Sequence, residues 1–434
     1  MMNLFERVFK LKENKTNLKT ELLAGLTTFF TMSYLFILSP KILATAGLDF
    51  ASTLTITAIF IFIGSTLMGL YANKPYAVAP FLGETAFIAF TICASLGFSI
   101  KTALAAIVIC GTILLLMTIL NLRTYIVNQI PEAIKVAFCT GLGLFFIFIA
   151  LKDIGIVSFT QNPIPLETGN FTKLPIILGV LSFLILITLV KKKVQAAVLI
   201  SIVTTTILGI IFGDVSIPEK LISLPTLPTQ SLLQTDFAGL LDKNFIPIFF
   251  VIFLLVNIDT AGALIGLSYK TETTNTDEKN NKKAMIADSI SVILAPLMGT
   301  TTPGAYLDSM TGINAGGRTG LTAITVGMLF LLGLLFTPII MIIPPYAYAP
   351  ALLYVGILMT SVITKIDFED ISEFAPIIFT ICAMIFTYNI GSGIIIGFII
   401  YPLTKLLCGQ KNRTNLISWI LFVLSIIYLI IYPY

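Results

Sequence analysis

Three acidic residues, Glu84, Asp259 and Asp308, lie inside apolar stretches of the sequence. If these stretches cross a bilayer, a charged side chain near its centre costs about 2.5–3.5 kcal/mol even on a lenient insertion scale, so each acid is a candidate functional residue. A buried carboxyl group can take up and release a proton, or accept hydrogen bonds from the N–H groups of a polar ligand. The sequence contains no histidine, so any proton coupling must use carboxylates.

Two of these acids follow a proline in a string that is poorly suited to a regular helix. Pro80 lies four residues before Glu84, and Pro303 lies five residues before Asp308, in a stretch rich in glycine and hydroxylated residues. Such strings predict discontinuous spans whose backbone groups and helix N-termini face a protein cavity. The alternative for Glu84 is an ordinary kinked helix with a loop-exposed carboxylate.

Asp259 lies deep in an unbroken apolar run that offers no Lys or Arg to pair with it. A ligand or proton site is the favoured interpretation, and a capped structural Asp is the alternative. Thr28 belongs to a hydroxyl-rich first segment that could line the same cavity, although interhelical hydrogen bonding explains it equally well. Phe87 offers a ring that could stack on a flat ligand.

The composition predicts that these segments are membrane spans. The chain is 57% hydrophobic and only 11% charged, with a mean hydropathy of +0.99. Soluble domains have roughly 45–50% apolar and about 25% charged residues. The net charge of +4 is too small and too scattered to suggest a nucleic-acid partner. The five cysteines show no metal-ligand spacing, so we expect no metal and no cofactor.

The apolar segments number about 14, each near the length that spans a bilayer. They form two series of seven, so the second half enters the membrane from the opposite side, as in an inverted repeat. We therefore predict an all-α polytopic membrane protein with broken helices at spans 3 and 10. The first series is 21–40, 53–71, 78–98, 101–121, 133–151, 172–190 and 194–213. The second is 244–268, 284–298, 301–314, 319–343, 347–364, 374–389 and 391–408.

The distribution of basic residues predicts a cytoplasmic N-terminus in a cell membrane, because short cytoplasmic loops collect Lys and Arg. Most basic residues, including Arg123 and Lys405, then fall on the cytoplasmic side. Those left on the other side are Lys41, Lys101, Lys152, Lys173, Lys220 and Lys243. The segment 414–432 is additionally hydrophobic and predicts either a fifteenth span or a helix on the membrane surface.

Five strings give the chain a resemblance that runs nearly end to end. It resembles the AzgA-like branch of the nucleobase-cation symporter-2 superfamily, whose members carry adenine, guanine or hypoxanthine with protons. The strings are Glu21–Phe29 (ELLAGLTTF), Met68–Asn73 (MGLYAN), Asp259–Gly262 (DTAG), Tyr306–Ser309 (YLDS) and Ala315–Ala323 (AGGRTGLTA).

The resemblance implies a core domain that holds the substrate and moves against a gate domain, usually within a homodimer. The implied boundaries are a cytoplasmic arm 1–20, a core of 21–122 (spans 1–4) and 244–343 (spans 8–11), a gate of 133–213 (spans 5–7) and 347–408 (spans 12–14), and an extracytoplasmic loop 214–243.

By position, the resemblance makes Asp259 the family's eighth-span acid and Asp308 its tenth-span acid, which is more often Glu. In the third span, Glu84, Thr85 and Phe87 stand where the family usually has Leu, Asn and Tyr. The eighth span also has Val256 where the family has an earlier acid. Because both departures fall where substrate should bind, membership of the family is the firmer expectation and the identity of the purine the weaker one.

The leading hypothesis is a secondary active transporter that takes up a purine nucleobase with protons by alternating access. Glu84, Asp259 and Asp308 would bind substrate and serve proton coupling, with Thr85, Phe87 and Thr28 as further binding residues; sodium stays open as the coupling ion. One alternative is a carrier of another solute or an anion on the same fold, against which three buried acids and no buried base argue. Another is a non-transporting scaffold or receptor. An enzyme is not expected, and no residue is assigned a catalytic role, because the chain has no histidine and no reactive-cysteine setting.

Overall fold

The computed structural model describes residues 2–123, 131–159, 166–226, 228, 232–271, 278–366, 368–387, 389–410 and 414–431. The predicted loop 214–243 and the C-terminal segment 414–432 therefore lie partly outside the described residues. Nine helices of the described part are long and apolar enough to cross a membrane, and four shorter apolar helices accompany them. The chain is a multi-pass membrane protein, and its helices coincide with the predicted spans to within a few residues.

The first half begins with a short helix and continues through seven spans, the third of which is broken. Its elements are α1 (Met2–Phe9), α2 (Leu18–Met32), α3 (Leu35–Ala44), α4 (Phe50–Leu67), the π-helical η1 (Met68–Ala72), β1 (Val78–Pro80), α5 (Leu82–Ala86), the π-helical η2 (Phe87–Ser95), α6 (Ile100–Ile119), α8 (Glu132–Ile154), β2 (Val157–Phe159), β3 (Leu166–Thr168), α9 (Leu174–Lys191) and α10 (Ala197–Ile211).

The second half repeats that order and is again broken at its third span. Its elements are η3 (Gly239–Leu241), α11 (Phe245–Thr271), α12 (Glu278–Met298), β4 (Pro303–Ala305), α13 (Ser309–Asn314), α14 (Gly320–Gly333), η4 (Leu334–Phe336), α15 (Thr337–Met341), α16 (Pro345–Thr360), η5 (Ser361–Lys365), α17 (Ile371–Phe386), α18 (Ile390–Leu407) and α19 (Leu416–Ile431). The predicted repeat of seven spans, with breaks at the third of each series, is confirmed.

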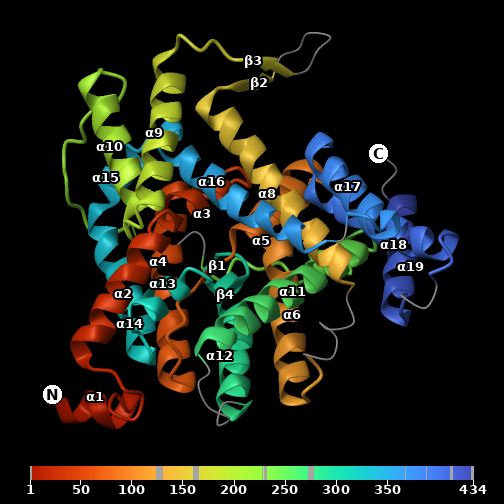
Figure 1. Ribbon diagram of the computed structural model, residues 1–434, viewed down its shortest axis with the longest axis horizontal. Coiled ribbons are helices and arrows are strands. Elements are labelled where there is room, and N and C mark those ends of the chain that lie inside the picture. Colours follow the sequence, from red (N-terminus) through yellow and green to blue (C-terminus); the bar gives the residue numbers. More distant parts are fainter. Residues whose placement is uncertain are drawn as a thin grey trace.

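The two broken spans meet at the centre of the molecule (Figure 1). Strands β1 and β4 pair antiparallel, with Val78 opposite Ala305 and Pro80 opposite Pro303. The prolines lack an N–H group, which suits a two-stranded sheet because both of its strands are edges. Gly304 leaves room for a neighbouring ring, since a Cβ atom added there would lie 2.2 Å from the ring of Phe81. The strands thus satisfy backbone groups that a broken helix would otherwise leave unpaired in an apolar interior.

The helices pack as two sets. In the set that we call the core helices, α14 packs against α2 and α4, and α12 packs against α6. In the set that we call the gate helices, α8 packs against α16 and α17, α9 against α10 and α16, and α17 against α18. Strands β1 and β4 pack against the core helices α4 and α12. The gate helices α16, α17 and α18 run across the upper and right-hand part of the molecule in Figure 1.

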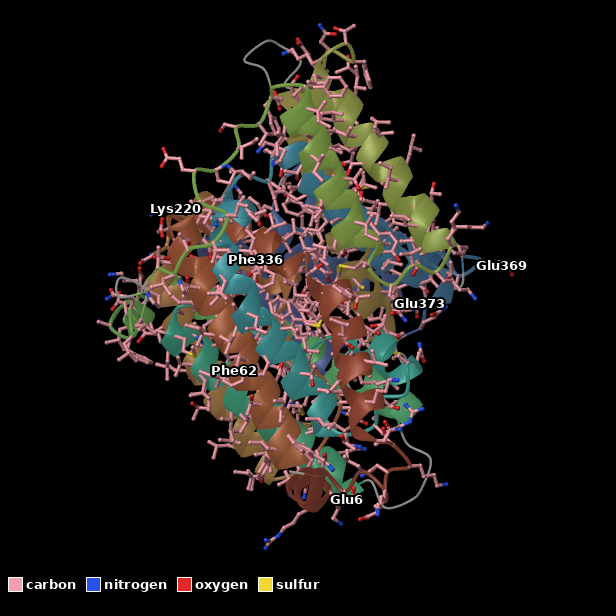
Figure 2. The ribbon with its side chains drawn as sticks, turned by 90° about the vertical axis from the view of Figure 1, so that its left-hand side faces the viewer. Glu6, Phe62, Lys220, Phe336, Glu369 and Glu373 are labelled. Carbon is pink, nitrogen blue, oxygen red and sulfur yellow. The ribbon has the colours of Figure 1, made fainter. Side chains whose placement is uncertain are left out.

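Apolar side chains cover much of the outer surface, as a lipid-facing surface requires. Figure 2 shows Phe62 and Phe336 on one side of the bundle, with Lys220 above them and Glu6 below them, and Phe336 is 47% exposed. The C-terminal helix α19 packs against α18 and also contacts α11. Its exposed residues include Leu416 and Ile430, so its outer face is equally apolar.

One close helix crossing joins spans 2 and 11 in the core helices. Gly69 in η1 faces Gly320 at the start of α14, and a Cβ atom added to Gly320 would lie 1.9 Å from the carbonyl oxygen of Gly69. A backbone oxygen cannot move aside as a flexible side chain can. The crossing therefore requires glycine.

We predict that Gly320→Ala destabilises the protein by about 1–3 kcal/mol, the usual cost of overpacking a close contact. Gly262→Ala is the matched control, because it adds the same methyl group to helix α11 at a position with no heavy atom within 4 Å. Thermal unfolding of the detergent-solubilised variants measures both. Equal melting temperatures for the two variants would contradict the close crossing.

Candidate functional site

Glu84 lies on the short helix α5, directly after strand β1. Its side chain is 1% exposed, and neither carboxylate oxygen has a hydrogen-bond partner among the described residues. The carboxylate of Asp259 is near enough to act on it electrostatically, and the side chain of Thr302 lies beside it. An acid without partners in the centre of a membrane protein is costly unless it binds a proton or a ligand. The structure thus rules out a loop-exposed Glu84.

Asp259 is half-buried on α11, the span that crosses beside both broken spans. No hydrogen bond from the described residues reaches its carboxylate. Tyr306, which follows β4, lies within electrostatic range of both Asp259 and Asp308. Its ring stacks on Phe81 at a centroid distance of 5.6 Å, and its hydroxyl donates to the carbonyl of Pro80 at 3.3 Å. The stacked pair holds the two broken spans together between the acids.

Asp308 is half-buried at the start of α13. One of its carboxylate oxygens accepts a hydrogen bond from the hydroxyl of Tyr34 at 3.3 Å. Tyr34 lies between α2 and α3, at the middle of span 1, and the gate residue Tyr354 is also within electrostatic range of Asp308. Three acids from three different spans therefore converge around the β1–β4 pair.

The other residues assigned to the site from the sequence face protein neighbours. The hydroxyl of Thr85 lies 2.7 Å from the hydroxyl of Thr301, across the two broken spans. Thr28 packs against α13, where a Cβ atom added to Gly312 would lie 2.2 Å from its hydroxyl oxygen. Phe87 begins η2 and is turned toward α18, 3.0 Å from a Cβ atom placed on Gly391.

A buried ion pair, Arg123 with Asp288, also lies among the core helices. The expectation that no base is buried was therefore wrong. Arg123 was assigned to a cytoplasmic loop, but its side chain is 0% exposed and pairs with Asp288 of α12 at 2.7 Å. The guanidinium also donates to the hydroxyl of Thr260, the neighbour of Asp259 in the chain. Arg123 reaches inward because its side chain is long enough to carry the charge from the end of α6 to an acid that would otherwise be unpaired.

Lys405 is also fully buried, at the end of α18 in the gate helices. It lies 2.6 Å from Glu373, which Figure 2 labels, and donates to the hydroxyl of Ser372 at 2.8 Å. Arg123 and Lys405, the two fully buried bases of the described residues, are therefore each neutralised by an acid of their own. Neither offers a free positive charge to the three central acids.

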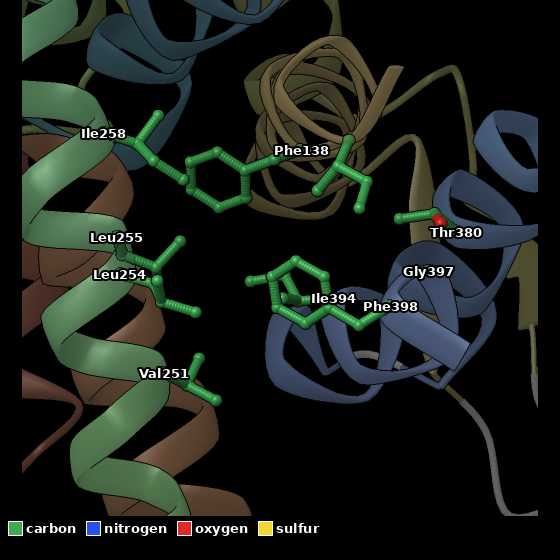
Figure 3. A pocket seen from close by; sticks show the side chains of 10 residues that line it. Phe138, Val251, Leu254, Leu255, Ile258, Thr380, Ile394, Gly397 and Phe398 are labelled. Carbon is green, nitrogen blue, oxygen red and sulfur yellow. The ribbon is translucent and has the colours of Figure 1, made fainter. Parts of the chain in front are cut away.

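A small apolar cleft lies between α11 and the gate helices, as Figure 3 shows. Val251, Leu254, Leu255 and Ile258 line one side from α11. The other side comes from α8, α17 and α18 and consists of Ile134, Phe138, Thr380, Ile394, Gly397 and Phe398. Ile258, the last of these residues on α11, directly precedes Asp259 in the chain, but Asp259 does not line the cleft.

Sequence reasoning missed Arg123, Asp288 and the role of Tyr306. Asp288 carried the same signal as the other three acids, a charge within an apolar segment, and that criterion would have found it. Arg123 gave no such signal, because it follows its span in a position typical of a cytoplasmic arginine.

Comparison with known proteins places this chain among permeases. The model of the permease family matches residues 19–396. The adenine permease AdeP of Escherichia coli is 38% identical over 435 residues, covering 98% of this chain and 96% of that protein. The guanine/hypoxanthine permease PbuO of Bacillus subtilis is 33% identical over 432 residues, covering 98% of this chain and all of that protein.

A solved structure shares the fold. The transmembrane domain of the cyanobacterial bicarbonate transporter BicA superposes with a TM-score of 0.60, covering 92% of this chain and 97% of that domain, at 18% identity. At that identity the likeness speaks for the architecture alone.

We predict that Arg123→Met destabilises the protein by about 3–5 kcal/mol, because it leaves the Asp288 carboxylate buried and unpaired. Replacing both partners, Arg123→Met with Asp288→Leu, removes the unpaired charge and should recover most of that loss. A double-mutant cycle by thermal unfolding measures the coupling. If the double variant is as unstable as the sum of the two single variants, the pair is not what stabilises this region.

Proposed function

Because this chain belongs to the permease family, we propose that it carries a purine nucleobase into the cell across the cell membrane, driven by protons. The family and the relatives are permeases rather than enzymes. Adenine and guanine/hypoxanthine are the cargoes named for the relatives, and they define the substrate class of this proposal. The N-terminus is cytoplasmic within the proposal, as the basic loops predict.

The observation that carries the proposal is the convergence of Glu84, Asp259 and Asp308 on the β1–β4 pair, with no cation from the described residues among them. Carboxylates accept hydrogen bonds, and purine bases present ring and exocyclic N–H groups that donate them. A planar base also suits stacking on the rings of Tyr306 and Phe81, which already lie parallel to within 27°.

Within this proposal, the residues divide between contact and support. Asp259 and Asp308 are partly exposed and accept from the base, while Glu84 lies behind them and exchanges the proton. The hydroxyl of Thr85 is engaged by Thr301, and Thr28 faces Gly312, so both shape the walls of the site. Phe87 lines its gate side.

Alternating access requires the core helices to move against the gate helices. The cleft in Figure 3 has the properties of such a seam, because aliphatic and aromatic side chains line it and no ion pair of the described residues crosses it there. Apolar surfaces can slide or part without breaking charged contacts. A seam of this kind supports rigid-body motion, with the acids of α5, α11 and α13 carried on one side of it.

An anion carrier on the same fold is the alternative suggested by the bicarbonate transporter domain. An anion would meet three carboxyl groups here. Arg123, a fully buried base beside the core helices, is already neutralised by Asp288. Electrostatics therefore favours a neutral ligand with hydrogen-bond donors over an anion.

We expect purified protein in proteoliposomes to accumulate labelled adenine, guanine or hypoxanthine when the outside is more acidic than the lumen. Protons then run down their gradient with the substrate. Collapsing the gradient with a protonophore should abolish accumulation, and bicarbonate should not compete. If none of the three bases accumulates, the purine assignment is wrong; a sodium gradient tested in parallel identifies that ion if it is the coupled one.

Asp259→Asn and Asp308→Asn should each weaken nucleobase binding by about tenfold or more, because an amide replaces an acceptor oxygen by a donor that faces the ligand's own donors. Asp49→Asn is the matched control. The backbone N–H of Ser52 lowers the pKa of Asp49, so it is an ionised acid of the core helices, but it lies at the exposed start of α4. Isothermal titration measures all three, and equal affinities would place the site elsewhere.

The Glu84→Gln variant tests whether Glu84 carries the coupled proton. The amide has the shape of a protonated carboxyl and cannot release a proton. We expect exchange of labelled base across the membrane to persist while accumulation in a pH gradient is lost. Accumulation at the unaltered level would assign the proton to another group.

A further inference from the structure

One face of α2 lies along the second broken span from its cytoplasmic end to its middle. The residues on this face are Glu21, Ala24, Thr28 and Thr31, spaced by three or four positions as on one side of a helix. Each of them touches α13 or the start of α14. Figure 1 shows α2 beside α13 and α14.

Glu21 caps α14 from a distant part of the chain. It is 0% exposed, and its two carboxylate oxygens accept from the backbone N–H of Arg318 at 2.8 Å, the backbone N–H of Thr319 at 3.3 Å and the hydroxyl of Thr322 at 2.6 Å. Thr319 is the N-cap residue of α14, yet its own side chain makes no capping bond. Glu21 therefore supplies the negative charge that a helix N-terminus favours.

Arg318 stabilises the turn between α13 and α14 from the other side, and we call this turn the α13–α14 joint. One guanidinium nitrogen donates to the carbonyls of Ile313 at 2.7 Å and Gly317 at 2.9 Å, at the end of α13. A base thus closes the C-terminus of α13 while an acid closes the N-terminus of α14, each where the helix dipole favours its charge. The carboxylate of Glu21, which lies on α2, thus holds the turn between α13 and α14 against α2.

Further along the face, the contacts run from the joint to the site. Gly312 lies close to Ala24, since an added Cβ atom would be 2.7 Å from its carbonyl oxygen. The hydroxyls of Thr31 and Thr311 lie 3.1 Å apart, and the Thr311 hydroxyl donates to the carbonyl of Asp308 at 2.7 Å. Tyr34 of span 1 then binds the carboxylate of Asp308.

We propose that Glu21 is a positioning residue for the substrate site: by fixing the α13–α14 joint to α2 it sets where Asp308 stands. It touches no substrate and acts through α13. The functional part of this inference rests on the proposed transport function, and the structural part does not.

The structural part is tested by cross-linking. Thr31→Cys with Thr311→Cys, in a variant with Cys93, Cys110, Cys139, Cys382 and Cys408 replaced, places two thiols where hydroxyls lie 3.1 Å apart. We expect efficient disulfide formation with Glu21 present and a several-fold lower yield in Glu21→Ala. Asp49→Ala is the matched control, because Asp49 caps the core helix α4 through the N–H of Ser52 at 2.8 Å. An equal yield in Glu21→Ala and Asp49→Ala would overturn the proposal, whatever the protein transports.

The functional part is tested by uptake kinetics. Glu21→Ala should raise the apparent KM for the transported base by about tenfold, because a site residue that is displaced by even a fraction of an ångström loses its ligand geometry. Glu21→Gln keeps one acceptor oxygen and should fall between Glu21→Ala and the natural protein. Asp49→Ala should lower the melting temperature, because it removes the cap of α4, but should leave KM unchanged. A lower Vmax with an unaltered KM in Glu21→Ala would show a merely structural role and refute the proposal.

Discussion

The pairing of β1 with β4 is the constraint on which the rest of the structure depends. A broken span exposes backbone N–H and C=O groups to an apolar interior, where each unsatisfied group costs several kcal/mol, on the order of a lost hydrogen bond or more. Here the backbone groups of each broken span form hydrogen bonds with those of the other. Two further bonds extend the ladder: the N–H of Tyr306 donates to the carbonyl of Ala77, and the N–H of Phe81 donates to the carbonyl of Thr302. Antiparallel strands at the third span of each series require those two spans to run in opposite directions. Two broken spans can pair in this way only if the second half of the chain enters the membrane in the direction opposite to the first, as in an inverted repeat.

The buried acids fall into two groups: those whose contacts stabilise the fold and those that remain available to a ligand. Asp288 has Arg123, and Glu21 has the N-terminus of α14, so both charges are satisfied where they stand. Glu84 and Asp259 have no such partner among the described residues. Because an uncompensated buried charge is so costly, a proton or a ligand donor must stabilise these two, and that requirement links the electrostatics of the core to transport.

Much of the fold could be predicted from sequence, because span length, proline placement and loop charge are local properties of the chain. The breaks at Pro80 and Pro303 were visible for that reason. The site could be predicted only in part. Burial of an acid in an apolar segment is local, but the partner of Arg123 lies 165 residues away, and no pattern near Glu21 indicates that it caps α14. Contacts between distant segments follow from the packing, which neither periodicity nor composition specifies.

Three of the five strings that carry the family resemblance meet at one place outside the proposed substrate site, whereas the other two contain Asp259 and Asp308. Glu21, Asn73 and Arg318 come from three of them, and Asn73 accepts from the N–H of Gly320 at 2.9 Å while it donates to the carbonyl of Phe9 at 3.0 Å. This joint is built from capped helix ends and a glycine crossing that tolerate little change, so its sequence reports the fold. The third span, in contrast, places Glu84 on the short helix α5, within electrostatic range of Asp259 and away from this joint. The helix joint and the proposed substrate site thus use different residues of the same scaffold.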